Sequence, residues 1–240
     1  MADTQKLNIL YEEAGILAVN KPAGLVVHSD GRTEEKTLSD LLIREYPEIK
    51  EVGEPWENNE GKVIYRPGIV HRIDRDTSGV LLVAKDQKTY LYLKEQFQDR
   101  KISKKYHAFA YGNIKEEEGS IDKPIGKSKK DFRQWSAQPG ARGTLREAVT
   151  EFRVLKRMGE YVFLELSPKT GRTHQLRVHL KAIHHPIMCD SLYAPNRECG
   201  LGFERLALHA RSIDFFTPDG KNHLIEAPYP EDFVKALATS

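Results

Sequence analysis

Cysteine is scarce in this chain of 240 residues, which contains only Cys189 and Cys199. Two cysteines could form one bridge, but a chain of this size with so few is more typical of reduced thiols than of a secreted disulfide framework. The N-terminus has no apolar signal segment, and no hydrophobic run is long enough to cross a bilayer. We therefore expect reduced cysteines, a cytoplasmic protein and no membrane partner.

An excess of charge of one sign is also absent, because the formal net charge is only +2. This sum excludes a uniformly cationic nucleic-acid binder, but it is compatible with a basic cleft balanced by acidic residues elsewhere. Hydrophobic residues at 39% and charged residues at 30% are ordinary for a globular protein with a sizeable core. There is no internal repeat and no obvious linker. We expect one domain over residues 1–240.

Several catalytic motifs are missing as well. There is no glycine-rich phosphate loop and no Gly-x-Ser-x-Gly element, so Ser78 has little claim as an acyl nucleophile. Asp76-Thr-Ser-Gly79 resembles an aspartic-protease loop, but the intervening serine and the neighbouring Arg75 do not suit a paired acidic site. One histidine-rich patch lacks the spacing of known metal sites, so no metal is expected. This patch comprises His174, His179, His184, His185 and Cys189.

Charge and apolar residues are interleaved most closely at residues 69–84, which read Ile-Val-His-Arg-Ile-Asp-Arg-Asp-Thr-Ser-Gly-Val-Leu-Leu-Val-Ala. The two apolar runs are typical of buried strands. Charged side chains beside a core usually either pair with an opposite charge or have a function at a site. Asp74 lies between Arg72 and Arg75. A carboxylate held by an arginine stays ionised and can serve as a nucleophile or general base. The alternative is an Asp–Arg pair that only holds the loop.

The first part of the chain predicts two short strands over residues 7–21, around a turn at residues 13–15. In Lys21-Pro-Ala-Gly24, proline and glycine fix a turn and place Lys21 at the end of a strand. A lysine there is usually a solvated surface group, and the alternative is a cation at the mouth of a site. Thr37 is the expected N-cap of a helix over residues 37–46. Residues 47–68 form a long polar loop, either functional or mobile.

The middle of the chain predicts a strand over residues 79–85, a helix over residues 86–97 and a strand over residues 106–111. Residues 112–143 look irregular. Basic side chains with interleaved aromatic ones suit an extended nucleic-acid backbone and unstacked bases, and a solvated surface excursion explains them equally well. These side chains are Lys127, Lys129, Lys130, Phe132, Arg133, Trp135, Arg142 and, just beyond, Arg146.

The last part predicts a β-hairpin over residues 150–167 and a helix that Thr173 caps and Pro186 ends. Arg177 lies on the first full turn of this helix, near where Gly171 and Arg172 enter. More strands are expected between residues 206 and 227, and a short helix from Glu231. The chain is therefore of mixed α and β elements, in which antiparallel hairpins predominate.

Four blocks of the sequence resemble the RluA-type pseudouridine synthases, which modify ribosomal and transfer RNA. His71-Arg-Ile-Asp-Arg-Asp-Thr-Ser-Gly79 resembles the central motif of that family. Three further blocks follow the family order: Lys21-Pro-Ala-Gly24, Lys105-Tyr106-His-Ala108 and Gly171-Arg-Thr-His-Gln-Leu-Arg177. Leu206-Ala-Leu-His-Ala210 and Ala227-Pro-Tyr-Pro also fit. The likeness covers nearly the whole chain, from Leu7 to Phe233.

Carried over onto the matching positions, the resemblance implies that Asp74 is the catalytic nucleophile and that Tyr106 stacks on the target uracil. It implies that Arg177 pairs with Asp74 and keeps it ionised. Arg72 would occupy the space left by the flipped base, and Lys21 would lie near the pocket in a supporting role.

The resemblance also implies an α+β fold, in which a mixed, largely antiparallel sheet with flanking helices forms a central RNA-binding cleft. Arg75, Arg172 and His174 lie in the same motifs and are expected to support RNA binding. The reaction requires no cofactor and no metal, and its partner is ribosomal or transfer RNA. No obligate protein partner is implied, and we expect a monomer.

The sequence departs from the family pattern in a few places. Ile73 stands where leucine is usual. Met188-Cys189-Asp190 and Tyr193-Ala194 replace glycines that are common around that Asp and Tyr, which puts the local turn in question but not the chemistry. The catalytic domain begins within the first ten residues, so we expect no separate S4 RNA-binding domain. Two other functions stay open beside the synthase: an RNA-binding protein without catalysis, and a metal-dependent hydrolase that uses the histidine-rich patch.

Overall fold

The structure is a computed structural model that describes residues 6–13, 15–29, 35–57, 61 and 63–239. The chain forms two compact units. The first comprises residues 1–102 and 212–228, and the second residues 103–211 and 229–240. The strands of each unit pair antiparallel, so the predicted α+β class with a largely antiparallel sheet is confirmed. The expected central RNA-binding cleft and the single domain stay predictions.

The first unit is built on the strands β1 (Ile9–Glu13), β2 (Ile16–Lys21) and β5 (Ser78–Ala84), in that order. Every residue of β5 is buried, as the apolar run predicts. The register of β2 and β5 places Lys21 opposite Gly79, which joins the first sequence motif to the central one. In the same unit, the second half of β13 (Leu208–Phe216) pairs with β14 (Asn222–Glu226).

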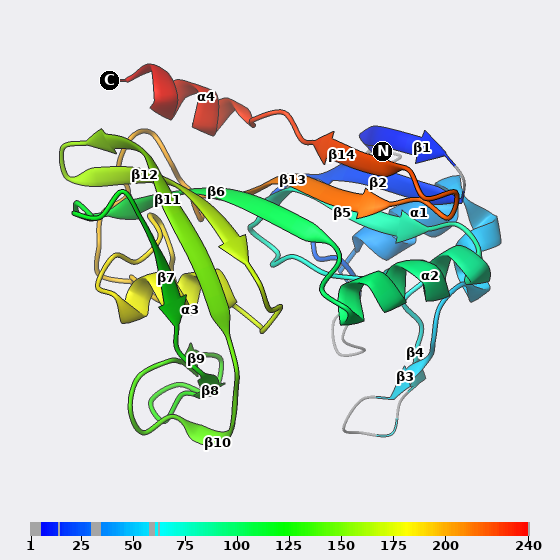
Figure 1. Cartoon of the computed structure of the whole chain (residues 1–240), viewed down its shortest axis with the longest axis horizontal. Coiled ribbons are helices and arrows are strands. Elements are labelled where there is room, and N and C mark those ends of the chain that lie inside the picture. The colour runs from blue at the N-terminus through cyan, green and yellow to red at the C-terminus, as the bar shows by residue number, and fades with distance from the viewer. Residues whose placement is uncertain (1–5, 14, 30–34, 58–60, 62, 240) are drawn as a thin grey trace. The chain divides into compact units, whose positions relative to one another are not determined.

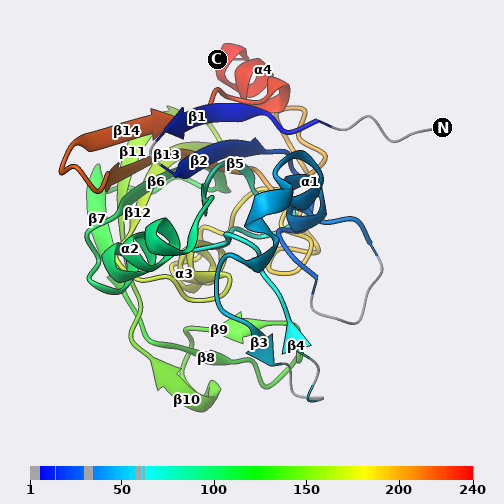
Figure 2. The same cartoon turned by 90° about the vertical axis from the view of Figure 1, so that its right-hand side faces the viewer.

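The first unit has two α-helices, α1 (Leu38–Glu45) and α2 (Gln87–Gln98), among its described residues, and α2 lies below the strands of this unit in both views (Figures 1 and 2). Both begin as the sequence predicts. Thr37 and Asp40 form a capping box at α1, and the Asp86 side chain accepts the Thr89 N–H at the start of α2. The caps satisfy backbone N–H groups that would otherwise lack partners.

The described part of residues 47–68 is more ordered than the expected loop. It contains a 3₁₀ helix, η1 (Pro47–Glu51), and a short hairpin of β3 (Trp56–Glu57) and β4 (Val63–Ile64). The hairpin projects away from the strands of this unit (Figure 1). Its strands are two residues long, which is too short for an alternating pattern to be read from the sequence.

The second unit has four neighbouring antiparallel strands, in the spatial order β6 (Ser103–Tyr111), β12 (Tyr161–Pro168), β11 (Val149–Met158) and β7 (Glu118–Asp122). The predicted hairpin is confirmed as β11–β12. The segment expected to be irregular instead holds β7 and a small sheet of β8 (Ile125–Lys127), β9 (Trp135–Ser136) and β10 (Arg142–Arg146). Its short, polar strands depend on their pairing and not on a periodic apolar pattern.

Helices α3 (Gln175–Ala182) and α4 (Glu231–Ala238) cover opposite faces of these four strands (Figure 1). Phe233 of α4 packs on Phe109 and Phe203, whereas His179 of α3 contacts Thr150. Side chains alternate along paired strands, so Tyr106, which lies opposite Leu166, projects from the face that α3 covers. No helix within the described part of the chain is long and apolar enough to cross a membrane.

Candidate active site

Asp74 lies in a loop that leads from the β3–β4 hairpin into β5. The Asp74 carbonyl accepts the Thr77 N–H at 3.2 Å, which closes a tight turn, and the Asp74 side chain is half-buried. Ile73 and Thr77, on either side, are buried at 7% and 2% exposure. Apolar anchors therefore hold the loop on the core while the carboxylate stays near the surface.

His71 fixes the start of this loop. Its Nε2 accepts the backbone N–H of Leu82 at 2.9 Å, and its ring lies 4.7 Å from that of Phe97. Because Nε2 acts as an acceptor, the imidazole is neutral in this contact and its proton lies on Nδ1. His71 therefore has a structural part in the motif, joining the loop to β5 and α2.

Lys21 is fully buried, so the expectation of a solvated surface group is wrong. Its Nζ donates to the carbonyl oxygens of Pro22, Leu25 and Arg75, each at 2.8 Å. A buried ammonium requires such acceptors to offset its lost hydration. The Arg75 carbonyl also accepts the Gly24 N–H at 2.9 Å. Lys21 thus ties its own turn to the residue next to Asp74, and its supporting role at the pocket stays a prediction.

The two arginines that flank Asp74 differ in their surroundings. Arg75 forms an ion pair with Glu35 through its guanidinium group. Arg72 is exposed, and within the described residues no carboxylate pairs with it. Arg72 is therefore available to an anionic partner, whereas Arg75 contributes its backbone to the Lys21 site.

Tyr106 is 9% exposed on β6, in the second unit. Lys104 precedes it by two residues, so both side chains project from the same face of the strand. Lys104 is half-buried, and burial lowers the pKa of its ammonium group. An ammonium close to the expected stacking tyrosine was not among the predicted site residues, although the Lys-Lys-Tyr sequence points to it.

Arg177 forms a two-pronged ion pair with Asp190. Its Nε lies 2.7 Å from Oδ2 and its Nη2 lies 2.8 Å from Oδ1, and the Asp190 side chain is completely buried. The Asp190 carboxylate also accepts the N–H groups of Leu192 and Tyr193. The guanidinium carbon lies 5.0 Å from the centre of the Tyr193 ring. These contacts hold the guanidinium group of Arg177 in one orientation.

Asp190 and Tyr193 were not predicted as site residues. Asp190 follows Arg177 by thirteen residues and is separated from it by the end of α3 and a turn. The signal in the sequence was the departure from the family pattern at Met188-Cys189-Asp190 and Tyr193-Ala194, where the glycines usual around this Asp and Tyr are replaced.

His174 and Arg172 organise the start of α3. His174 is the N-cap residue, with φ of 56° and no side-chain cap, so the expected cap by Thr173 is wrong. Its Nδ1 lies 2.9 Å from the Tyr193 hydroxyl. Arg172 donates from Nε to the Glu147 carbonyl at 2.9 Å. The Gln175 side chain accepts the Arg172 N–H and so ties the first residue of α3 to the segment before the helix. The helix also ends at Ala182, earlier than Pro186.

Each unit thus brings part of the predicted site together. The first unit assembles Lys21 with the loop that carries Asp74. The second unit places Tyr106 and Arg177 on one side of its four neighbouring strands. The expected meeting of Asp74 with the other two side chains stays a prediction.

The histidine-rich patch is occupied by structural contacts. His179 is buried between Thr150 and the Lys123 carbonyl, at 2.9 and 3.0 Å, and burial lowers its pKa. Among the described residues, no group of three histidine, cysteine or acidic side chains could hold a metal ion. Cys189 and Cys199 form a disulfide, so the expectation of reduced thiols is wrong. Turns bring their Cα atoms to 5.0 Å, a proximity that cysteine counts cannot reveal.

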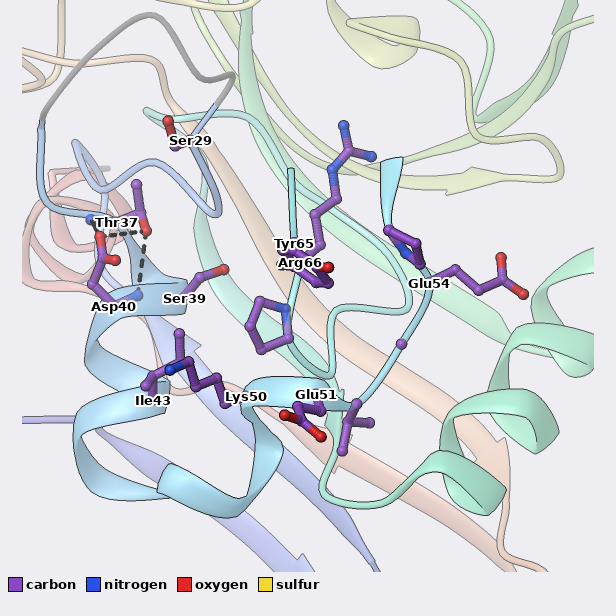
Figure 3. A pocket seen from close by; sticks show the side chains of 14 residues that line it. Ser29, Thr37, Ser39, Asp40, Ile43, Lys50, Glu51, Glu54, Tyr65 and Arg66 are labelled. Carbon is purple, nitrogen blue, oxygen red and sulfur yellow. Dashed lines mark hydrogen bonds between the residues drawn. The ribbon is translucent and has the colours of Figure 1, made fainter. Parts of the chain in front are cut away.

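A pocket of about 450 Å³ opens in the first unit between α1, η1 and the segment after β4 (Figure 3). Arg66 and Tyr65 line it on one side, and Figure 3 shows the Arg66 side chain extending away from Lys50 and Glu51. Asp40, on the other side, is engaged in the α1 capping box.

A second pocket of about 350 Å³ lies in the other unit, between α3 and the segment after β8. Its basic side chains are Lys129, Lys130 and Lys181. The Lys127 ammonium lies 4.2 Å from the centre of the Trp135 ring nearby. This is the segment in which basic and aromatic residues alternate, and its side chains are compatible with a nucleic-acid backbone.

Comparison with known proteins gives matches along nearly the whole chain. Residues 15–182 match the family described as RNA pseudouridylate synthase. The chain is 37% identical to the uncharacterized RNA pseudouridine synthase YlyB of Bacillus subtilis, over 99% of this chain and 74% of that protein. It is also 37% identical to the ribosomal large subunit pseudouridine synthase D of Borreliella burgdorferi, over 96% of this chain and 67% of the relative.

The fold has a counterpart among solved structures. The human protein RNA Pseudouridylate Synthase Domain Containing 1 is similar with a TM-score of 0.75 and 25% identity, over 96% of this chain and 86% of that one. Sequence and structure comparisons therefore agree over the same extent of chain.

Proposed function

The chain belongs to the RNA pseudouridylate synthase family and is an isomerase that acts on RNA, and we propose that it converts uridine to pseudouridine through Asp74. The observation that carries this proposal is the family match over residues 15–182, which includes the loop of Asp74, the strand of Tyr106 and the helix of Arg177.

The reaction breaks the bond between N1 of uracil and C1′ of the ribose and joins C1′ to C5. The C5 proton leaves and N1 gains a proton, so the oxidation state does not change and no external nucleophile is consumed. A carboxylate suits this chemistry because it can act as a nucleophile or accept a proton. The half-buried Asp74 side chain, with its loop fixed by Lys21 and His71, supports this role.

Tyr106 and Arg177 complete the proposed site. Tyr106 stacks on the target uracil, and Arg177 keeps Asp74 ionised, because an adjacent positive charge favours the charged form of a carboxyl group. The buried Asp190 supports this role for Arg177 because it fixes the guanidinium plane from one edge. Lys21 acts through the loop and not on the substrate.

The target uridine has to leave its stack, which costs a few kcal/mol. Stacking on Tyr106 returns about 1–3 kcal/mol. Arg72 fills the space left by the base, which its exposure and its lack of a described carboxylate partner support. Arg75, Arg172, His174 and the basic segment over residues 127–146 contribute to RNA binding.

Ribosomal RNA is the proposed substrate, because a relative of 37% identity carries the name ribosomal large subunit pseudouridine synthase D. Transfer RNA is the second substrate class within the proposal. A cytoplasmic location, a monomeric state and a single catalytic domain also belong to the proposal.

The test is Asp74→Asn, with Asp99→Asn as the control, because Asp99 is an exposed carboxylate paired with Lys101. Pseudouridine formation is measured in transcripts of large-subunit ribosomal RNA and of transfer RNA. We expect Asp74→Asn to lower turnover by several orders of magnitude and Asp99→Asn to retain it. Site-resolved pseudouridine mapping of cellular RNA, with and without this protein, then identifies the uridine.

Full activity of Asp74→Asn would refute the catalytic role of this carboxylate. RNA binding by the unmodified protein with no pseudouridine in any cellular RNA would favour the non-catalytic alternative. The two results concern different steps, so each hypothesis can fail separately.

A further inference from the structure

Two arginines of the first unit carry positive charge without a described carboxylate partner. Within the part of the chain that the structure describes, neither Arg66 nor Arg72 forms an ion pair, and the Nε of Arg66 is buried without a hydrogen-bond partner. Burial is the main cause that lowers the pKa of Arg66. A partly buried guanidinium group without a counterion favours binding of an anion.

An exposed aromatic ring adjoins these charges. The Arg66 guanidinium carbon lies 4.4 Å from the centre of the Trp56 ring, so the two planar groups form a cation–π pair. Trp56 is 40% exposed and Tyr65, the neighbour of Arg66, is 64% exposed. Large aromatic side chains beside unpaired arginines are typical of surfaces that bind single-stranded nucleic acid.

The acidic side chains of the adjoining pocket are largely engaged elsewhere. Asp40 belongs to the capping box of α1. Glu54 pairs with Lys94 of α2, at 2.5 and 2.6 Å from its two oxygens. Glu51 also lines the pocket, but the Arg66 side chain extends away from it (Figure 3), and among the described residues no carboxylate pairs with Arg66.

We propose that Trp56 and Arg66 form a subsite for one nucleotide that flanks the target uridine in the RNA. The phosphate of this nucleotide binds the Arg66 guanidinium group, because a guanidinium can donate two parallel hydrogen bonds to phosphate oxygens. Its base packs on the exposed part of the Trp56 ring. Arg66 lies eight residues before Asp74, on the segment that leads into the proposed catalytic loop. The inference rests on the proposed function for its ligand, RNA.

A purely structural pairing is the competing explanation. In that case Arg66 only covers Trp56 and stiffens the β3–β4 hairpin, and RNA does not touch either. The two explanations differ in one measurable property, because a phosphate contact releases counterions and makes RNA affinity depend on salt.

The experiment measures the affinity for a fluorescein-labelled oligouridylate by anisotropy, at several KCl concentrations. The variants are Arg66→Gln, Trp56→Ala and Trp56→Phe, with Lys221→Gln as the control. Lys221 is an exposed cation of the same unit, so its loss changes the net charge equally. Thermal unfolding of each variant verifies that the hairpin change leaves the fold intact.

We expect Arg66→Gln to reduce the slope of log affinity against log salt by about 0.7, the value for one phosphate contact to a single strand. Trp56→Ala should weaken binding about tenfold, and Trp56→Phe should restore most of it because it keeps an aromatic face. If Arg66→Gln and Trp56→Ala match Lys221→Gln in both affinity and slope, the subsite does not exist.

Failure of this inference and failure of the proposed function are distinguishable. If Asp74→Asn abolishes pseudouridine formation while the Trp56 and Arg66 variants bind like the control, the function stands and the subsite is refuted. If no RNA is modified but binding depends on Trp56 and Arg66 as expected, the subsite stands without the catalytic function.

Discussion

Replacement of Lys21 by methionine tests how the loop of Asp74 is held. Methionine is close to lysine in length and volume, so it fills the same buried space without the ammonium group. The change removes the three hydrogen bonds to Pro22, Leu25 and Arg75. Two of these carbonyls then lose the partner described here, whereas that of Arg75 keeps the Gly24 N–H.

The expected cost follows from these contacts. Each hydrogen bond from a charged donor contributes about 1.5–3 kcal/mol, and a buried acceptor left without a partner costs about 1–3 kcal/mol. Burial of the ammonium group opposes folding, and its removal offsets part of the loss. We expect the free energy of unfolding to fall by about 3 kcal/mol. For a domain of this size the corresponding fall in Tm is about 6–12 °C.

Activity should fall more than stability alone explains. At a temperature where Lys21→Met is still folded, the loop of Asp74 has lost its tie to the first motif, and a displacement of about 1 Å can lower a rate about 10²-fold. Calorimetry gives Tm and pseudouridine release gives kcat, with the exposed Lys221→Met as control. A variant with unchanged Tm and unchanged kcat would refute the reasoning that Lys21 positions the loop.

Two further predictions concern the second unit. Asp190→Asn should lower kcat about 10²-fold with little change in KM, because Arg177 loses its orienting carboxylate. The control is Asp219→Asn, since Asp219 is exposed. Equal kcat values for the two variants would contradict this role of Asp190. Burial lowers the pKa values of His107 and His179. Since the unfolded chain then binds more protons, stability should be complete above the usual pKa of about 6.5 and be lost as the pH falls through and below it. Tm measured between about pH 8 and pH 5 checks this, and a Tm that rises on acidification would contradict it.

The elements that the sequence predicts well are those fixed by local chemistry. Thr37 followed by Asp40 specifies the start of α1, because both side chains bond within the first turn. The apolar run over residues 80–84, rich in β-branched and aliphatic side chains and preceded by Gly79, predicts a buried strand with both faces covered. The turn at Gly159 between two alternating segments predicts β11 and β12.

The features that the sequence does not predict depend on partners distant along the chain. Lys21 is polar and ends a strand, so its burial becomes understandable only once the carbonyl of Arg75 is placed beside it. The pairing of Arg177 with Asp190 depends on a turn after α3, and the disulfide depends on the same region. No periodic pattern carries such information.

The two motifs that contain Lys21 and Asp74 are far apart in the sequence but belong to one structural element. The register of β2 and β5 sets Lys21 opposite Gly79, and the ammonium then reaches the carbonyl of the residue after Asp74. A buried lysine is costly, and a hydrophobic residue of the same size would usually serve the core as well. Its presence is explained if the position of the Asp74 loop matters more than the stability of the core. The stability lost by burying Lys21 is then explained by the need to position the Asp74 loop, and not by the packing of the core.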